Sequence, residues 1–273
     1  MNPSPASMNP LDYGRDFGWR AAADHVATYV LMRLFRRGFH QRAVPRHEEL
    51  HQGAQLVSPS AHTIVTDYVL AGRNEADLAQ IQREHDALYR ELGERYASRA
   101  LPYPRHYEVE KESSLLLYAL VRATGPDRVV ETGVANGASS FFLLHALRKN
   151  GRGQLASVDV RGNVGGLLDD SERREWRLTI LGASRRGAQF KSLVADGPPI
   201  DVFLHDSDHR YLWQMLELES AVANMATRSI VLCDDADSSY AFLDYCHAMG
   251  RRPAYLAELR KVLGLLRIDE ARR

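Results

Sequence analysis

After about residue 100, short runs of β-branched and other apolar residues alternate with segments of helical length. This alternation constrains the fold more than any other feature of the sequence. It is typical of a parallel sheet with helices on both faces. The sequence predicts seven strands, at Arg128–Glu131, Leu155–Val160, Trp176–Leu181, Asp201–His205, Ser229–Cys233, Pro253–Leu256 and Val262–Ile268. The last two strands are close enough in the chain to form a hairpin.

Helices are expected between these strands. The sequence predicts them at Glu112–Ala123, Ser139–Lys149, Asp208–Met225 and Ser239–Met249. Gly151 and Gly250 follow two of these helices and suit the left-handed turn that ends many helices. We therefore expect an α/β fold that is Rossmann-like, with a seven-stranded, mostly parallel sheet and helices on both of its faces.

The first hundred residues have a helical periodicity instead. Asn74 could cap a helix, and four apolar residues share one face of that helix: Leu78, Ile81, Leu88 and Leu92. Ala22–Phe35 is a second amphipathic stretch. The residues from 41 to 60 are polar and irregular.

The proline-stiffened segment Leu101–Pro104 separates the two regions. We therefore predict an N-terminal helical extension over residues 1–100 and a second domain over residues 101–273. The extension would form a lid over the site or a contact between copies of a homo-oligomer.

Charge and composition disfavour several kinds of partner. The formal net charge is zero, so no overall field attracts nucleic acid or an anionic membrane. The most membrane-like run, Val26–Phe35, is interrupted by Arg33 and falls short of the roughly 20 apolar residues that span a bilayer. Cys233 and Cys246 make neither a disulfide framework nor a metal knuckle. We expect a cytoplasmic protein that binds neither nucleic acid nor membrane.

The segment Val129–Ser140 combines a strand end, a glycine turn and a helix start. Gly133 and Gly137 permit a tight turn and a close approach of a ligand to the backbone. The helix N-terminus behind them offers free N–H groups to an anion. The spacing differs from the G-x-G-x-x-G pattern of dinucleotide sites, which disfavours a nicotinamide oxidoreductase. Asp159 ends the next strand and is placed to accept hydrogen bonds from a ribose diol.

The motif Glu131-x-Gly133-x-x-x-Gly137, followed by Ser157-Val158-Asp159, resembles the first two motifs of the class I methyltransferases, which use S-adenosylmethionine (SAM). The stretches "VVETGVANGASSFFLLHAL", "DVFLHDSDHRY" and "VLCDDADSSYAF" are similar to small-molecule and sugar O-methyltransferases of the macrocin, mycinamicin and actinobacterial saccharide types. The resemblance extends over residues 108–268. It implies SAM as the cofactor, bound by Glu131, Gly133, Asn136, Gly137, Ser139, Asp159 and Ser184.

Pairs of acidic residues follow two of the predicted strands. Asp206 and Asp208 follow one strand, and Asp234 and Asp235 follow another. If the strands are neighbours, four acids converge beyond their carboxyl ends, where ligands bind in open parallel sheets. Such crowding is costly without a cation, and Mg²⁺ or Mn²⁺ would relieve it. The resemblance implies Asp206, Asp234 and Asp235 as the metal ligands; capping of a turn is the alternative role for the last two.

His209 lies three residues after Asp206, in what is predicted to be the first turn of a helix, so the two side chains would share a face. One could hold a metal while the other takes the proton of the same substrate hydroxyl. Sugar-modifying members of the resembling family use a His at the spacing of His209 or an Asp at the spacing of Asp208. Both are therefore candidate catalytic bases. The alternatives are a helix cap for Asp208 and a solvated helix position for His209.

Together these features predict a SAM-dependent, Mg²⁺-assisted O-methyltransferase acting on a hydroxyl of a saccharide or another small-molecule natural product. A catechol-type phenol is the closest alternative acceptor and would need a more apolar, aromatic-walled pocket. The other alternative is a non-catalytic nucleotide-binding protein that kept the fold. Proximity of the three metal-ligand candidates to His209 would argue against it, and their dispersal would support it.

Overall fold

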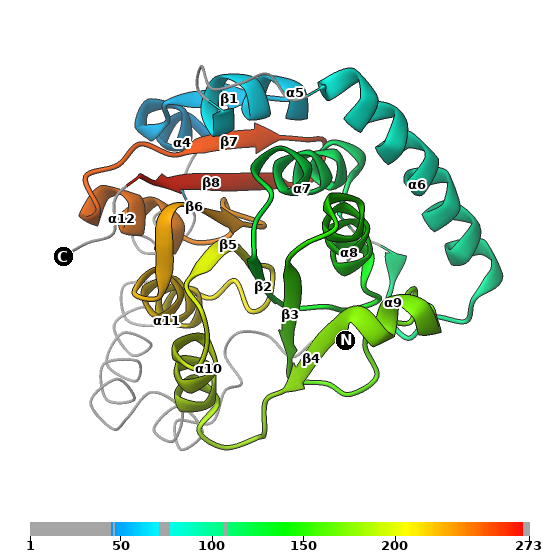
Figure 1. The fold of residues 1–273 in the computed structure, drawn as a ribbon. Helices are drawn as coiled ribbons and strands as arrows, with labels where there is room; N and C mark the ends of the chain where they lie inside the picture. The colour runs from blue at the N-terminus through cyan, green and yellow to red at the C-terminus, as the bar shows by residue number, and fades with distance from the viewer. Residues whose placement is uncertain (1–44, 46, 71–76, 106–108, 270–273) are drawn as a thin grey trace.

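An eight-stranded sheet forms the centre of the computed structural model, which describes residues 45, 47–70, 77–105 and 109–269 (Figure 1). The strands are β1 (Leu56–Ser58), β2 (Arg128–Thr132), β3 (Gln154–Asp159), β4 (Trp176–Ile180), β5 (Ile200–His205), β6 (Met225–Cys233), β7 (Ala254–Ala257) and β8 (Val262–Ile268). All seven predicted strands are present, and β1 is an eighth that was not predicted.

The strand order is β1-β7-β8-β6-β5-β2-β3-β4. Neighbouring strands are parallel except where β8 is involved, because β8 is antiparallel to both β6 and β7. The predicted hairpin of the last two strands is therefore confirmed. The chain adds β3 and β4 on one side of β2 and then returns to place β5 on the other side. This reversal makes the gap between β2 and β5 a switch point, where open α/β sheets bind their ligands.

Helices pack on both faces of the sheet (Figure 1). One face carries α7 (Lys111–Thr124) and α8 (Ala138–Asn150), and the other carries α10 (Arg186–Ala195), α11 (Tyr211–Val222) and α12 (Ala241–Ala248). Neighbouring strand residues point to opposite faces, so each central strand contributes apolar side chains to two separate cores. The short helix α9 (Asp170–Glu175) precedes β4.

The helix predicted at Asp208–Met225 is shorter than expected at both ends. It begins only at Tyr211, because Arg210 has an extended backbone with φ −68° and ψ 139°, and Met225 already belongs to β6. His209 therefore lies in the loop between β5 and α11 and not in a first helical turn. The left-handed turns predicted after two other helices are confirmed by φ angles of 67° at Gly151 and 63° at Gly250.

The described part of the N-terminal hundred residues packs against the same sheet and against the helices that cover it. It contains α4 (His47–Gly53), α5 (Ala61–Thr63), a π-helix labelled η2 (Ile64–Leu70) and the long helix α6 (Leu78–Ser98). Strand β1 lies in the stretch expected to be irregular and pairs with β7. The cap of α6 is Asp77, whose side chain accepts a hydrogen bond from the backbone N–H of Gln80 at 2.9 Å. The predicted cap Asn74 and the predicted helix Ala22–Phe35 lie outside the described residues.

A buried ion pair joins α6 to the sheet domain. Arg95 Nη1 donates to Glu172 Oε2 at 2.6 Å, and the Glu172 side chain is almost fully buried. Glu172 also hydrogen-bonds to His145 at 2.7 Å and accepts from the backbone N–H of Asp169 at 2.8 Å. These contacts fix α6 against α8 and α9.

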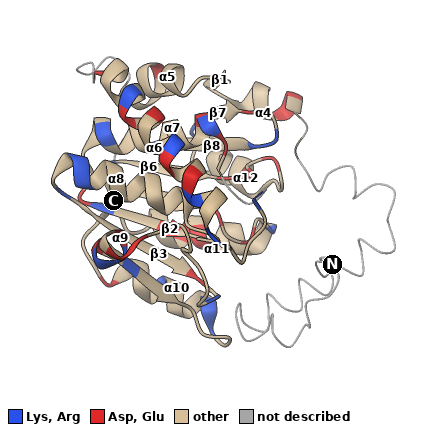
Figure 2. Ribbon diagram, turned by 90° about the vertical axis from the view of Figure 1, so that its right-hand side faces the viewer, with Lys and Arg blue, Asp and Glu red and all other residues tan. Residues whose placement is uncertain are grey.

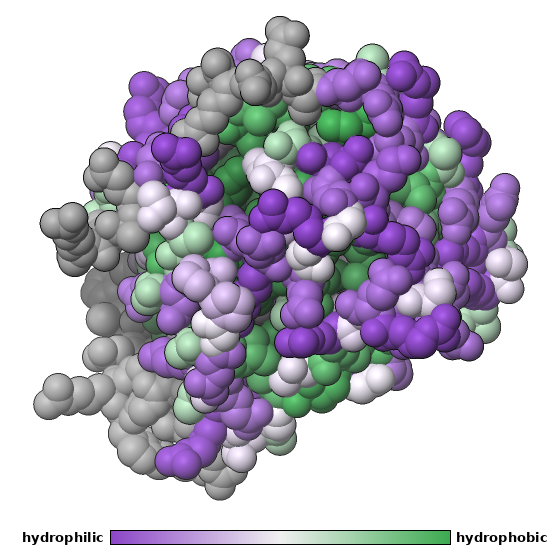
Figure 3. Space-filling model, in the orientation of Figure 1, coloured by the Kyte–Doolittle hydropathy of each residue, from purple (hydrophilic) through white to green (hydrophobic). Residues whose placement is uncertain are grey.

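Basic and acidic residues are interspersed over the described helices, in keeping with the zero net charge (Figure 2). Polar side chains cover most of the face shown in Figure 3, with apolar side chains visible between them. Among the residues that the structure describes, no helix is long and apolar enough to cross a membrane.

Candidate functional site

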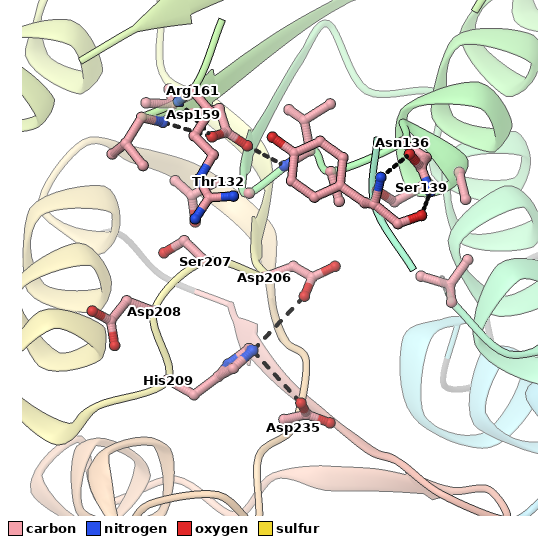
Figure 4. A pocket seen from close by; sticks show the side chains of 18 of the residues that line it. Thr132, Asn136, Ser139, Asp159, Arg161, Asp206, Ser207, Asp208, His209 and Asp235 are labelled. Atoms are coloured by element: carbon pink, nitrogen blue, oxygen red, sulfur yellow. Dashed lines mark hydrogen bonds and ion pairs between the residues drawn. The ribbon is translucent and has the colours of Figure 1, made fainter. Parts of the chain in front are cut away.

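A cavity of about 640 Å³ opens beyond the carboxyl ends of β2, β3 and β5, at the switch point of the sheet (Figure 4). The loops that follow these strands line it, together with α6, the segment after α6, and Lys261, which directly precedes β8. This volume falls within the range of about 300–1,000 Å³ that is typical of small-molecule sites. The cavity therefore lies where the sheet topology predicts a ligand.

The glycine loop after β2 forms one wall of the cavity. Gly133 has φ +80°, and a Cβ atom there would lie 1.8 Å from the carbonyl oxygen of Asp206. Gly137 has φ +89°, and its Cβ would lie 3.0 Å from the Cα of Gly165. Glycine suits both positions, because it adopts a left-handed backbone without strain and has no Cβ to collide with the neighbouring backbone. The predicted cofactor residues that line the cavity from this loop and the helix start are Gly133, Asn136 and Ser139.

Glu131, predicted to bind the cofactor, is fully buried beneath the loop and does not line the cavity. Its carboxyl group accepts hydrogen bonds from Ser139 at 2.5 Å and from Ser140 and Ser157 at 2.6 Å. Burial raises the pKa of this carboxyl group, although the three hydroxyls oppose the shift. Glu131 thus ties β2, β3 and the start of α8 together and supports the loop from behind.

Asp159 lies at the end of β3 and lines the cavity, as predicted. Its carboxylate accepts hydrogen bonds from three backbone N–H groups, those of Val134 at 2.9 Å, Val160 at 2.7 Å and Arg161 at 2.9 Å. The side chain therefore links the glycine loop to the turn after β3. Ser184, by contrast, does not line the cavity, and its carbonyl oxygen accepts a hydrogen bond from Gln189 at 2.7 Å.

The segment that follows α6 is fastened to the glycine loop. The backbone N–H of Tyr103 donates to the Asn136 side chain at 3.2 Å, and the Asn136 amide donates back to the Tyr103 carbonyl at 3.0 Å. Tyr103, Tyr96 and the two prolines beside Tyr103 line the cavity. The predicted junction between the two halves of the chain is thus part of the cavity wall.

Three side chains from two loops meet at the far end of the cavity. His209 Nε2 lies 3.9 Å from Asp206 Oδ1 and 3.6 Å from Asp235 Oδ2, so that the imidazole sits between two carboxylates (Figure 4). Asp234 lies beneath them, with 1% of its surface exposed. Potential ligand atoms of Asp206, His209 and Asp234 all lie within 4.8 Å of one another. The structure therefore brings together the three predicted metal ligands and the predicted base.

The cluster shifts the pKa values of its members. Burial, reinforced by the carboxylate of Asp234, raises the pKa of Asp206 well above its usual range and raises that of Asp235 to about 6. Burial, reinforced by the nearby His205, lowers the pKa of His209 to about 4. His209 is therefore neutral at pH 7 and has a ring nitrogen that can accept a proton.

Asp208, the second candidate base, is engaged elsewhere. Its carboxylate accepts hydrogen bonds from Arg210 Nε at 2.7 and 2.8 Å and from the Arg210 backbone N–H at 3.1 Å. Although burial opposes the shift, the guanidinium lowers the pKa of Asp208. In Figure 4 its carboxylate points away from His209. Arg210, and not Asp208, occupies the N-cap position of α11.

Two functional side chains at this site were not found by sequence reasoning. The Lys261 ammonium contacts Asp234 Oδ2. The buried Glu217 of α11 accepts hydrogen bonds from Thr132 at 2.6 Å, Trp213 at 2.6 Å and Ser207 at 3.0 Å, and it is 2.6 Å from the ring of His205. Lys261 is 27 residues from Asp234 in the sequence, whereas Glu217 lies on the helix that directly follows the loop after β5. The sequence does mark Lys261 in one way: lysine is rare in this chain, with four in all, and this one directly precedes the last predicted strand.

Comparisons with known proteins agree with this geometry. Residues 130–236 match the model of a family described as a methyltransferase domain. No curated protein matches the chain. An O-methyltransferase from Bacillus cereus in complex with SAH is 14% identical, with 76% of this chain and 99% of that chain covered and a TM-score of 0.50. The SAM complex of TomG, an O-methyltransferase of Streptomyces achromogenes involved in tomaymycin synthesis, is 15% identical, with 74% and 95% covered and a TM-score of 0.49.

At 14% identity and a TM-score of 0.50, the Bacillus cereus structure shows a shared fold and no more. The family match adds a position in the chain: it runs from β2 to the residues just after β6. It therefore contains the glycine loop, Asp159 and the whole acidic cluster. Most of the cavity lining therefore belongs to the segment that is similar to a methyltransferase domain, and Tyr96, Tyr103 and Lys261 are contributed from outside it.

Proposed function

We propose that the protein is a SAM-dependent O-methyltransferase that acts on a hydroxyl group of a small molecule, with a saccharide as the preferred class of acceptor. The observation that carries this proposal is the position of His209, a neutral base that lies 3.6 Å from Asp235 and 3.9 Å from Asp206. It faces the same cavity as the glycine loop. The methyltransferase-domain match over residues 130–236 supports the reaction class.

The residues around the glycine loop suit SAM. The backbone at Gly133 lines the cavity with no side chain in the way, and Asn136 and Ser139 present polar groups beside it. Asp159 lines the same cavity and has a carboxylate at the position where a ribose diol is expected. These residues would hold the cofactor, with Glu131 supporting the loop from below.

A divalent cation would be held by Asp206 and Asp234, with Asp235 completing the set and His209 beside it as the base. Two observations support this fit. Potential ligand atoms of Asp206, His209 and Asp234 all lie within 4.8 Å of one another, and two ligands about 2.1–2.3 Å from one shared ion can be up to about 4.6 Å apart. Asp234 Oδ1 is buried and has no hydrogen-bond partner among the described residues. When bound, SAM supplies an electrophilic methyl group, and a divalent cation lowers the pKa of a coordinated hydroxyl.

The protein's own residues would handle the proton and the position of the acceptor. His209 Nε2 accepts the proton that the acceptor hydroxyl loses, because the half-buried ring is neutral at pH 7. Asp206 and Asp235 flank that nitrogen and stabilise the imidazolium that results. Glu217 fixes the chain around His205 and Ser207 and so holds the loop that carries Asp206 and His209.

Two acceptor classes have support in the cavity. The charged side chains Arg161, Asp208 and Arg210 line it and favour a hydroxyl-rich molecule such as a saccharide. Tyr96, Tyr103 and Trp213 also line it, which favours a catechol-type phenol as the second candidate. The proximity of His209 to the acidic cluster argues against a non-catalytic nucleotide-binding protein, because nucleotide binding alone does not need a base among carboxylates.

The proposal is tested first by ligand binding. Isothermal titration calorimetry should detect binding of SAM and SAH, and Asp159→Ala should weaken both by at least about tenfold, through loss of a charged hydrogen-bond acceptor. A panel of saccharides and catechols, incubated with SAM that carries a labelled methyl group, then identifies the acceptor class. Binding of NADH without binding of SAM would overturn the proposal.

A further inference from the structure

Lys261 places an ammonium group inside the acidic cluster. Its side chain is 10% exposed and contacts Oδ2 of Asp234, whose own side chain is 2% exposed. Because Asp206 and Asp235 are close to the same ammonium, the three acids raise the pKa of Lys261, although burial alone would lower it. The cluster therefore already contains a cation.

The backbone around Lys261 is fixed from the side of the sheet. The N–H of Glu258 donates to the carbonyl of Lys261 at 3.0 Å and closes the turn between β7 and β8. The N–H of Ala236 donates to the carbonyl of Val262 at 2.8 Å, which ties the acidic loop after β6 to the start of β8. The position of Lys261 relative to Asp234 is thus set by the sheet itself.

The same turn is fixed from the side of α7. The carboxylate of Glu258 accepts hydrogen bonds from the N–H groups of Glu112 at 2.7 Å and Ser113 at 2.8 Å, in the first turn of that helix. Arg260 Nε donates to Glu110 Oε1 at 2.7 Å. Hydrogen bonds thus hold the turn from both sides. The side chain of Lys261 starts from this fixed turn, and its ammonium contacts Asp234.

The charges in the cluster can be counted. With all three carboxylates ionised, as the binding of a cation requires, and with His209 neutral, the cluster carries three negative charges, and the ammonium of Lys261 leaves two. A divalent cation would cancel these two charges, whereas a trivalent cation would leave a positive charge buried. The ammonium also donates a hydrogen bond to Asp234 Oδ2. The other oxygen, Oδ1, is buried without a hydrogen-bond partner among the described residues and is the one that can bind a metal.

We propose that Lys261 is a built-in competitor for the cation site, which lowers the affinity of the cluster for metals and sets its preference for divalent over trivalent ions. This inference rests on the cation site of the proposed function and adds the residue that tunes it. Repulsion between the ammonium and a cation a few ångströms away weakens binding, and the effect grows with the charge of the cation.

The test compares Lys261→Met with the wild-type protein, because methionine keeps most of the length of the side chain and removes its charge. Titration calorimetry should show Mn²⁺ binding at least about tenfold more tightly to the variant, since the repulsion of a buried ammonium is lost. Terbium luminescence should show a larger gain for Tb³⁺ than the gain for Mn²⁺. Lys191→Met, at an exposed position on α10, is the matched control and should leave both affinities unchanged.

Unchanged or weaker Mn²⁺ binding in Lys261→Met would overturn the proposal, because it would mean that the lysine organises Asp234 for the metal. Absence of Mn²⁺ binding in both proteins would overturn it as well. If the methionine variant does not fold, Lys261→Gln gives the same comparison, since its amide can still donate a hydrogen bond to Asp234. SAH titrations of the same proteins report separately on the methyltransferase proposal, which fails if the wild type does not bind SAH.

Discussion

The carbonyl oxygen of Asp206 lies 1.8 Å from the position that a Cβ atom on Gly133 would take. The glycine loop and the acidic loop therefore touch backbone to backbone. The N–H of Asp206 also donates to the carbonyl of Thr132 at 2.9 Å. The part of the cavity assigned to SAM and the part assigned to the reacting hydroxyl cannot move independently.

Gly133→Ala should therefore disturb both ends of the cavity. The added Cβ must displace the Asp206 backbone, and the left-handed φ of +80° adds strain. We expect at least a tenfold loss of SAH affinity, on the order of 1.4 kcal/mol or more, together with a lower melting temperature. Gly151→Ala is the control, because φ there is +67° but nothing lies within 4 Å of the added atom. Normal SAH binding by Gly133→Ala would show that the loops are less tightly coupled than their geometry indicates.

His209→Ala should lower kcat by about 10²–10⁴-fold, which is the usual contribution of a positioned base. SAM affinity should change little, because the imidazole sits between Asp206 and Asp235, away from the glycine loop. Asp208→Asn should retain most activity, since the Asp208 carboxylate is paired with Arg210. Steady-state kinetics and SAH calorimetry on both variants test this assignment. A large loss in Asp208→Asn with near-normal His209→Ala would transfer the role to Asp208.

Removal of divalent cations should abolish turnover and leave SAH binding intact. The reason is that the carboxylates of Asp206, Asp234 and Asp235 are crowded, whereas the glycine loop contains none of them. Activity should return with Mg²⁺ or Mn²⁺ after treatment with EDTA. Asp235→Asn should weaken this rescue while the fold survives, because the side chain is one-third exposed. Full activity in EDTA would contradict the metal assignment without touching the methyltransferase assignment.

Glu172→Gln should destabilise the protein and reduce its sensitivity to acid. Although burial opposes the shift, hydrogen bonds from His145 and Arg95 lower the pKa of Glu172 to about 2, from 4.5. A carboxyl group with a depressed pKa adds stability above its unfolded-state pKa. That stability is lost as the pH falls toward its folded-state pKa. The free energy of unfolding should therefore fall between about pH 4.5 and pH 2 by a contribution on the order of 3 kcal/mol.

Urea titrations at pH 7 and pH 3 measure this contribution in the wild type and in Glu172→Gln. The variant should be less stable at pH 7, and the difference should shrink at pH 3. Glu175→Gln is the control, because Glu175 belongs to the same helix but forms an exposed pair with Arg148; its cost should stay below about 1 kcal/mol. Equal effects of the two substitutions would contradict the assigned role of Glu172.

The sheet could be predicted because its strands are apolar runs with turn residues between them. Strand β1 escaped prediction because it has three residues, Leu56–Ser58, too few for any periodicity to register. The start of α11 was misplaced because the sequence Asp208-His209-Arg210 has no residue that forbids a helix. In the structure the Asp208 carboxylate accepts hydrogen bonds from the backbone N–H and the side chain of Arg210, and the backbone of Arg210 is extended.

At the site, residues that follow strands could be predicted, and residues supplied by topology could not. Asp206, Asp234 and Asp235 are visible as acids at strand ends, and adjacent parallel strands bring them together. Lys261 reaches them only because β8 pairs with β6, and no local sequence pattern predicts this pairing. Glu131 was assigned to the cofactor from a motif position, but the three serines that surround it draw its carboxylate into the core.

The last strand of the sheet in chain order is also an interior strand. β8 lies between β6 and β7 and follows directly on Lys261. While the ribosome has not yet released this strand, β6 and β7 each have an open edge, which is a template for pairing with another chain. Over the same interval, the crowded carboxylates lack their ammonium partner. The synthesis of residues 261–268 thus makes the sheet continuous and balances the charge of the cluster in one and the same step.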